Sequence, residues 1–480
     1  MHPFLQHSGS ELARMIRAKK ASCREVVETH IDQIRKVNPV LNAVVQGRFD
    51  LALREAAQAD EALTGPCSEA LQPFHGVPCS IKECFALTGM PNTSGLAARR
   101  GVVSHEDAVT VQRLRKAGAI PLGVTNVSEL CMWMETNNKV YGRTRNPYHP
   151  GRIVGGSSGG EGAIISAGGA PFGLGSDIGG SIRLPAFFNG VFGHKPSGGL
   201  VPNTGQYPIS ENEALRYLTT GPIARRAEDL LPLLRILAGP DGRDRGCLAM
   251  EIGDPSEVRL EELRVLLVRP KGTPPVCEDL LWAREKAAAF LARRGARVRE
   301  VSMDGLRHSR EIWSAMLARA SDTTFRERMG NGTPISAFRE LLLWMLGRSS
   351  HTLPAIILAL FEQIPERLPT LEKNFVELGK HLRRQFTELM GSDGILLHPP
   401  YVSAAPPHNK PMFPPFNWVY TAIFNVMEFP VTQVPLGLNR EGLPIGVQIV
   451  GPHGRDHVTI AVALAMESEF GGWVPPQLVG

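Results

Sequence analysis

Serines set among glycines are the residues of this sequence whose type and spacing could most readily do chemistry. Ser157 and Ser158 lie in GGSSGGEG, Ser181 lies in DIGGSIR, and the surrounding stretch 151–200 is about one-third glycine. Glycine lets a backbone approach a ligand closely and adopt positive φ, at an entropic cost that ordinary scaffolding does not favour. Because Ile, Leu, Phe and Val also occur throughout, the stretch is typical of a packed functional site rather than of a linker.

Three common glycine motifs describe this stretch less well. The segment GLGSDIGG spaces its glycines one residue too widely for a dinucleotide fingerprint. The segment GGSSGGEG lacks the G-K-[ST] ending of a phosphate loop. It does match G-x-S-x-G around Ser158, a nucleophile elbow that would need a downstream acid and a histidine, for which His194 and later histidines are candidates. That alternative stays open, but it leaves the second cluster, at Ser181, unexplained.

The same stretch resembles the amidase signature family over GGSSGGEGAIISAGGAPFGLGSDIGGSIRLPAFFNGVFGHKPSGG. Upstream, VPCSIKE resembles the lysine strand of that family, and GVTNVSEL, YGRTRNPY and GLPIGVQIVG extend the resemblance over nearly the whole chain. Within the family, ELCMWMETNNKVYGR, PAFFNGVFGHKPS and FGGWVPP are similar to fatty-acid amide hydrolases of the second type. The resemblance implies an α/β fold with a central mixed β-sheet covered by helices on both faces. It also implies a hydrolase that cleaves the carbon–nitrogen bond of amides with a hydrophobic acyl or aryl group.

A Ser-Ser-Lys triad follows from the resemblance. Ser181 would be the nucleophile that forms an acyl-enzyme, Ser157 the bridging serine and Lys82 the base, with a cis peptide bond before or beside Ser157. The same motifs imply two further groups: an oxyanion hole made by the backbone amides of Ile178, Gly179, Gly180 and Ser181, and loop-supporting residues Ser158, Asp177 and Arg183.

The chemistry explains why these residue types are needed. A serine hydroxyl is a poor nucleophile until a base removes its proton, and a lysine amine does so only if its pKa falls from about 10.4 toward 7 to 8. Burial lowers the pKa of a lysine, whereas a neighbouring carboxylate raises it. Glu83 follows Lys82 directly, but on a strand it should face the other way. Ser157 would relay the proton and later return it to the leaving amine.

The elements that must position these residues can be predicted along the chain as one domain, 1–480. N-terminal helices are expected over about 8–65, with Ser10 capping one, a Ser22–Glu25 capping box opening the next, and Pro39 ending it. A catalytic core is expected over about 74–200, with strands in VPCSIK and AIPLGVTN. A helical insertion is expected over about 305–390, followed by strands in ILLHPP and GLPIGVQIVG and a helix in HVTIAVALAMESEF.

The substrate is less clear from the sequence than the reaction. The apolar insertion segments 341–346 and 356–361 could line an acyl channel, lie on a membrane surface or simply pack in the core. Candidates for the wall of the acyl pocket are Met132, Trp133, Phe187 and Phe188. Alternatives are an ester or carbamate hydrolase of the same mechanism, the amidase subunit of a tRNA-dependent amidotransferase, or a binding protein that has lost its chemistry.

Bulk composition limits the remaining functions. The chain has 480 residues and a formal net charge of +5 with no basic block, so no nucleic-acid partner is expected. Its seven cysteines are scattered and form no C-x-x-C pair, which favours a reducing compartment over a disulfide framework or a zinc site. No apolar run is long enough for a transmembrane segment. We therefore expect a cytoplasmic monomer or homodimer without metal or cofactor, whose partner is a small amide, ester or carbamate.

Overall fold

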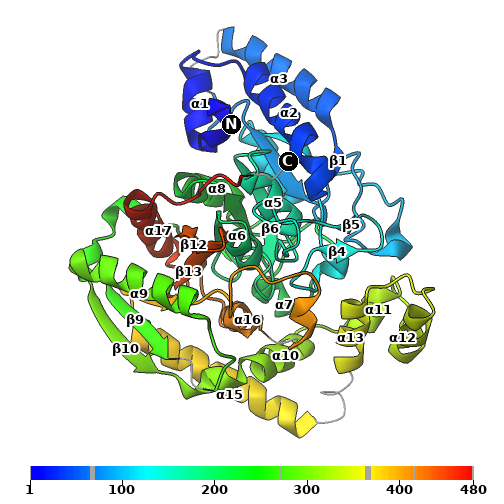
Figure 1. The fold of residues 1–480 in the computed structure, drawn as a ribbon, viewed down its shortest axis with the longest axis vertical. Coiled ribbons are helices and arrows are strands. Elements are labelled where there is room, and N and C mark those ends of the chain that lie inside the picture. The colour runs from blue at the N-terminus through cyan, green and yellow to red at the C-terminus, as the bar shows by residue number, and fades with distance from the viewer. Residues whose placement is uncertain (1, 65–70, 270–271, 363–368, 415–416, 478–480) are drawn as a thin grey trace.

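The computed structural model describes residues 2–64, 71–269, 272–362, 369–414 and 417–477, and one large sheet runs through it (Figure 1). Eleven strands lie in the order β1-β3-β2-β6-β8-β7-β12-β13-β11-β9-β10, and β4 pairs with β5 apart from them. The strand bounds are β1 Val44–Gly47, β2 Pro78–Lys82, β3 Ile120–Thr125, β4 Asn137–Asn138, β5 Gly142–Arg143, β6 Phe172–Asp177, β7 Phe192–Lys195, β8 Thr219–Ala224, β9 Arg264–Arg269, β10 Arg297–Ser302, β11 Gly394–His398, β12 Val431–Leu438 and β13 Pro444–Val450.

The sheet is mixed. Strand β2 runs parallel to β3 and β6, and β9 runs parallel to β10 and β11, while the other neighbouring strands are antiparallel. The segments VPCSIK, AIPLGVTN, ILLHPP and GLPIGVQIVG form β2, β3, β11 and β13 as predicted, all in this one sheet. Short β-prone runs are therefore reliable guides to the strands here.

Helices cover both faces of the sheet. On β7, the His194 ring bonds to Asp456 of α17, while a Cβ on the preceding Gly193 would lie 2.7 Å from Ala186 of α6. Since successive strand residues face opposite sides, α17 and α6 cover opposite faces, which confirms the predicted α/β fold. The helices are α1 Gly9–Arg17, α2 Cys23–Leu41, α3 Phe49–Thr64, α4 Val109–Lys116, α5 Gly159–Ser166, α6 Arg183–Phe188, α7 Ala214–Tyr217, α8 Leu230–Leu237, α9 Glu278–Arg293, α10 Ser309–Arg319, α11 Phe325–Met329, α12 Ala337–Met345, α13 Leu353–Phe361, α15 Pro369–Met390, α16 Val419–Val426 and α17 Asp456–Phe470.

The N-terminal helices correct two local predictions. The Ser22–Glu25 capping box of α2 is present, but α1 is capped by Ser8, whose hydroxyl accepts from the Glu11 amide at 2.9 Å. Ser10 instead donates to Asp229, 219 residues away. Helix α2 also continues past Pro39 to Leu41, since a proline removes only the one backbone bond that its missing N–H would have made. The left-handed Asn42 ends it instead.

Two kinds of helix follow β10. Helices α10 and α15 pack against α16 in a core cluster, whereas α11, α12 and α13 lie at the edge of the molecule (Figure 1) and form a smaller cluster with Leu96 and Leu130. Helix α12 turns large apolar side chains outward, and Phe338 and Leu346 are 66% and 68% exposed. No helix in the described ranges has both the length and the apolar character needed to cross a bilayer.

Candidate active site

Three segments meet at one edge of the sheet. Lys82 ends β2, Ser157 lies in the turn before α5, and Ser181 lies in the loop after β6. Strands β2 and β6 are parallel neighbours, so their carboxyl ends open at the same edge, where sites of α/β folds are usually found. The three segments that the sequence singled out are therefore brought together by strand pairing.

Lys82 is completely buried and bonds to two hydroxyls. Its Nζ donates to Ser157 Oγ at 2.7 Å and to Ser176 Oγ at 2.9 Å. The peptide bond between Gly156 and Ser157 is cis, as the resemblance implied. The Ser158 amide donates to the Ser181 carbonyl at 3.2 Å, and this bond joins the two serine loops. Ser181 keeps 8% of its surface exposed, against 1% for Ser157.

Two glycines let these loops approach their neighbours. A Cβ on Gly156 would lie 2.3 Å from the Trp133 carbonyl oxygen. Gly180 has a φ of +121°, and a Cβ there would lie 2.2 Å from Thr421 Oγ1. Any larger residue would push both serines away from the site, which is why the sequence is glycine-rich here.

Asp177 holds the loop that carries Ser181. Its carboxylate accepts from the Gly180 amide at 2.7 Å, from the Ile182 amide at 3.0 Å and from Arg183 Nη2 at 3.0 Å. Burial alone would raise the pKa of Asp177, but the Arg183 guanidinium outweighs it and holds this pKa well below its ordinary value. Asp177 is therefore a permanent anion within the loop.

Arg183 ties the loop to the rest of the fold. It is fully buried and donates to the Thr421 carbonyl, to Gln448 Oε1 and to Asn425 Oδ1 at 2.7 to 2.9 Å. These partners come from α16 and β13, far along the chain. Asp177 and Arg183 thus form hydrogen bonds to backbone groups and to neighbouring side chains. Their carboxylate and guanidinium groups have a structural role in this loop.

Two buried carboxyls flank Lys82. Glu83 accepts from the Thr93 amide, the Ser94 amide and the Tyr141 hydroxyl, away from the partners of Lys82 as strand alternation predicts. Glu161 lies in the first turn of α5, and its position among glycines and serines gives no signal in the sequence that it lies beside Lys82. Burial raises the pKa of each carboxyl to about 7.

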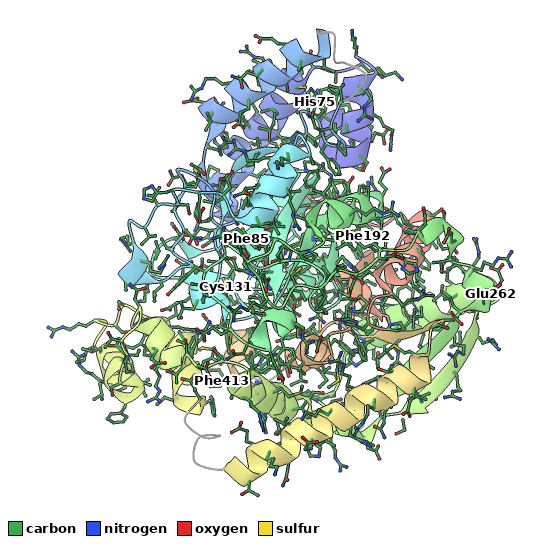
Figure 2. All side chains as sticks on the ribbon, turned by 180° about the vertical axis from the view of Figure 1, so that it is seen from behind. His75, Phe85, Cys131, Phe192, Glu262 and Phe413 are labelled. Carbon is green, nitrogen blue, oxygen red and sulfur yellow. The ribbon has the colours of Figure 1, made fainter. Side chains whose placement is uncertain are left out.

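Two cysteines that are 47 positions apart in the sequence meet beside the lysine. Cys131, labelled in Figure 2, ends the short 3-10 helix η4 (Glu129–Cys131) and lies beside Cys84 and Ser157. The Cys84 thiol, with Lys82 nearby, lowers the pKa of Cys131 to about 6. Among the described residues, no group of three or more His, Cys, Asp or Glu side chains could hold a metal ion.

The predicted pocket residues separate into two groups. Met132 and Trp133 are half-buried beside η4, but Phe187 and Phe188 lie wholly in the core, with Phe188 packed on Tyr401 at 5.3 Å. Two tryptophans that the sequence did not suggest lie closer to the Ser181 loop. Trp313 of α10 donates to the Ile178 carbonyl at 2.8 Å and stacks edge-on against Trp418 at 4.6 Å.

His194 does not serve the nucleophile-elbow alternative. His194 bonds to Thr432 at 2.9 Å and to Asp456 at 3.1 Å, on the face of the sheet covered by α17. The Ser158 hydroxyl instead lies 3.4 Å from the Ser176 carbonyl. Both ring nitrogens of His194 are thus used away from Ser158, and Ser158 has no base from this residue.

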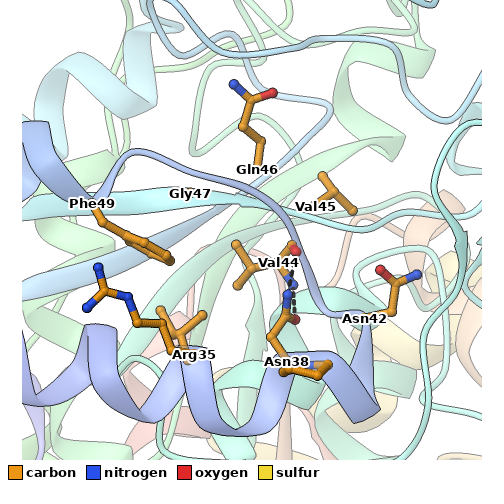
Figure 3. Close-up of a pocket in the computed structure, with 10 residues that line it drawn as sticks. Arg35, Asn38, Asn42, Val44, Val45, Gln46, Gly47 and Phe49 are labelled. Carbon is orange, nitrogen blue, oxygen red and sulfur yellow. Dashed lines mark hydrogen bonds between the residues drawn. The ribbon is translucent and has the colours of Figure 1, made fainter.

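A shallow surface hollow of about 550 Å³ lies where α2 ends and β1 begins (Figure 3). None of the residues that line it comes from the three catalytic segments. The Asn38 side chain bonds to the Ala43 and Val44 backbone there, so its polar atoms serve the turn. The hollow offers no group suited to amide cleavage.

Comparison with known proteins identifies the family of this chain. The amidase family model matches residues 25–460. Fatty-acid amide hydrolase 2-A of Danio rerio is 47% identical over 99% of this chain and 91% of its own length, and human fatty-acid amide hydrolase 2 is 43% identical with the same coverage. The structure of 6-aminohexanoate cyclic dimer hydrolase superposes with a TM-score of 0.82 at 26% identity, covering 99% of each chain. The chain therefore belongs to the amidase family and is an amide-cleaving hydrolase.

Proposed function

We propose that this enzyme cleaves fatty-acid amides and related amides with a hydrophobic acyl group, through an acyl-enzyme on Ser181. The observation that carries the proposal is the buried contact of 2.7 Å between Lys82 Nζ and Ser157 Oγ, next to the loop of Ser181. The two relatives named fatty-acid amide hydrolase 2 support the substrate class, because they align over 99% of this chain.

The proposed reaction starts with a neutral Lys82. Ser157 accepts the proton of Ser181 while giving its own to Lys82, and Ser181 Oγ attacks the amide carbonyl carbon. The carbon–nitrogen bond breaks as the same relay returns the proton to the leaving amine. Water then attacks the ester carbonyl, loses a proton to the relay, and releases the fatty acid and Ser181.

The set of backbone amides assigned to the oxyanion hole changes in one position. Gly180 gives its amide hydrogen to Asp177, so we assign oxyanion binding to the amides of Ile178, Gly179 and Ser181. Trp313 supports this arrangement, since it holds the Ile178 carbonyl and its ring lies 3.6 Å from where a Cβ of Gly179 would be. The acyl pocket we propose is lined by Met132, Trp133, Trp313 and Trp418.

A lipid surface is the partner we propose for α12. Its exposed apolar residues, Phe338, Leu342, Trp344, Met345 and Leu346, are flanked by the exposed cations Arg339 and Arg348. This composition suits an interfacial helix on an anionic membrane. Glu129, next to Cys131 and Met132, accepts from His351 at 2.6 Å and from the Thr352 amide at 2.7 Å, which joins the α12–α13 region to the site.

A cytoplasmic location and a monomeric or homodimeric state are also proposed. The cysteines among the described residues are all free thiols, which supports a reducing compartment. The +5 charge comes without a basic block, which supports a small-molecule substrate rather than a nucleic acid.

The test is hydrolysis by the purified chain alone. A series of p-nitroanilides from acetyl to long-chain acyl should show kcat/KM rising steeply with chain length, and a fluorophosphonate should label the wild type. A flat profile would favour a short aryl, ester or carbamate substrate. Absence of both hydrolysis and labelling would favour a subunit of a larger amidotransferase complex.

A further inference from the structure

Glu161 connects β2, the strand that ends at Lys82, to α5, the helix that begins just after Ser157. Its Oε2 accepts from Ser80 Oγ at 2.5 Å and its Oε1 accepts from Thr125 Oγ1 at 2.7 Å, in a fully buried position. Ser80 lies two residues before Lys82 on β2, and hence on the same face. Glu161 lies four residues after Ser157, in the first turn of α5.

The space around this carboxyl is closely fitted. A Cβ on Gly173 of β6 would lie 1.9 Å from Glu161 Oε2 and 2.5 Å from Ser80 Oγ. Glycine at position 173 therefore makes room for the bond between Ser80 and Glu161. Both carboxyl oxygens receive a hydroxyl hydrogen, which is the pattern that stabilises an ionised carboxylate.

We propose that Glu161 is a positioning residue of this site. Its bond to Ser80 holds β2 against α5, so that Lys82 lies within hydrogen-bond distance of Ser157. Its negative charge favours the ammonium form of Lys82, so that Glu161 influences the pH above which this base is neutral. The proposal rests on the proposed role of Lys82 as base. Its physical basis is that a nearby anion stabilises a cationic amine, in opposition to the burial that favours the neutral amine.

Other charged or titratable groups surround the pair. On and after β2 these are Cys79, Glu83 and Cys84; on η4 Cys131; and on β6 and α6 the ion pair Asp177–Arg183. Helix α2, which packs against α5, carries His30, whose ring bonds to the Val26 carbonyl. Burial raises the pKa of Cys79 and of Cys84, so both are neutral thiols. Glu83 faces away, which leaves Glu161 and Cys131, whose pKa is lowered, as the acidic groups that can act on Lys82. Burial raises the pKa of Glu161 to about 7, and the bonds from Ser80 and Thr125, followed by the charge of Lys82, act in the opposite direction. Glu161 is therefore an anion above about pH 7, and it interacts electrostatically with Lys82.

The experiment is the pH dependence of kcat/KM for wild type and Glu161→Gln. Glutamine keeps the shape, and because hydroxyls rotate, its amide can accept from one of Ser80 and Thr125 and donate to the other. The acid limb of the profile should move to lower pH by about one unit, with the plateau at high pH retained within a few-fold. An unchanged limb, or an equal loss of activity at every pH, would overturn the proposal.

Three matched variants sharpen the result. Ser80→Ala removes one donor to the carboxylate and should move the limb in the same direction by less, which keeps the proposal testable if Glu161→Gln folds poorly. Glu83→Gln removes the other flanking carboxyl and should leave the limb in place. Cys131→Ser measures the separate contribution of the thiolate.

Labelling by a fluorophosphonate at each pH gives a readout that needs no amide substrate. If the wild type neither hydrolyses amides nor labels, the proposed function fails. If the wild type labels with an acid limb and Glu161→Gln shares that limb, only the assignment of Glu161 fails.

Discussion

The signature region, residues 153–200, buries polar side chains, whereas helix α12 exposes apolar ones. Between residues 153 and 200 almost every residue is buried, including Lys82's partner Ser157 and the charged pair Asp177 and Arg183. In α12, Phe338, Leu342 and Leu346 face outward instead. A folded protein rarely accepts either arrangement without a function.

The difference lies in how each region is compensated. Buried polar groups of the signature region bond to one another, so their desolvation is offset within the fold. The exposed side chains of α12 are not buried by other described residues, and a lipid surface is the partner proposed for them. Changes in the first region should therefore damage the enzyme itself, whereas changes in the second should alter only what it docks to.

The largest expected effect is on the proposed nucleophile. Ser181→Ala should lower kcat by about 10³-fold or more and abolish fluorophosphonate labelling, because the proposed acyl-enzyme forms on the Ser181 hydroxyl. Its thermal midpoint should match that of the wild type, since Ser181 contributes little packing. Ser158→Ala is the control and should still be labelled; labelling that persists in Ser181→Ala would instead point to Ser158.

The next effect is on stability. Asp177→Asn should lower the free energy of unfolding by about 3 to 5 kcal/mol, because it leaves the buried Arg183 guanidinium without its anion. Since the pKa of Asp177 is depressed in the folded state, its contribution is full above the ordinary carboxyl value near 4 and disappears as the pH falls through the folded value. Urea unfolding at several pH values measures this. Glu262→Gln, at an exposed ion pair with Arg259, is the control and should change little.

A smaller effect concerns the pH dependence of stability at Glu161. Its pKa is about 7 in the folded state against an ordinary 4.5, so the native state binds more protons between these values and stability falls as pH rises through them. Glu161→Gln removes this penalty, and its stability relative to wild type should improve by up to about 3 kcal/mol between pH 4.5 and pH 8. A difference between the two proteins that stays constant with pH would contradict this prediction.

The smallest effect on the enzyme itself is expected at α12. The double substitution Leu342→Glu and Leu346→Glu should leave unfolding unchanged within about 0.5 kcal/mol, because both side chains are exposed. Binding to vesicles of phosphatidylcholine and phosphatidylserine should fall about tenfold or more. Turnover of a short, water-soluble amide serves as the control and should not change. Vesicle binding equal to that of the wild type would remove the functional contrast between the two regions.

Most of the fold could be predicted where local signals are strong. The apolar runs of β2, β3, β11 and β13 and the capping box of α2 need only neighbours in sequence. The errors at Ser10 and Pro39 arose where a distant partner, Asp229, or the position of the residue within its helix decided the outcome. The edge strand β10, mostly exposed and charged, gave no apolar signal at all.

The sequence motifs therefore predicted the type of reaction, whereas the contacts that position the reacting groups became known only from the tertiary structure. Glycine spacing and residue type pointed to Ser181, Ser157 and Lys82 because close backbone approach and proton transfer restrict which residues can occupy such loops. The sequence could not reveal that Trp313 holds Ile178, that Arg183 reaches Gln448, or that Glu161 bonds to Ser80 and Thr125. Those contacts depend on which strands and helices lie side by side, and that is decided only when the whole sheet buries its two faces.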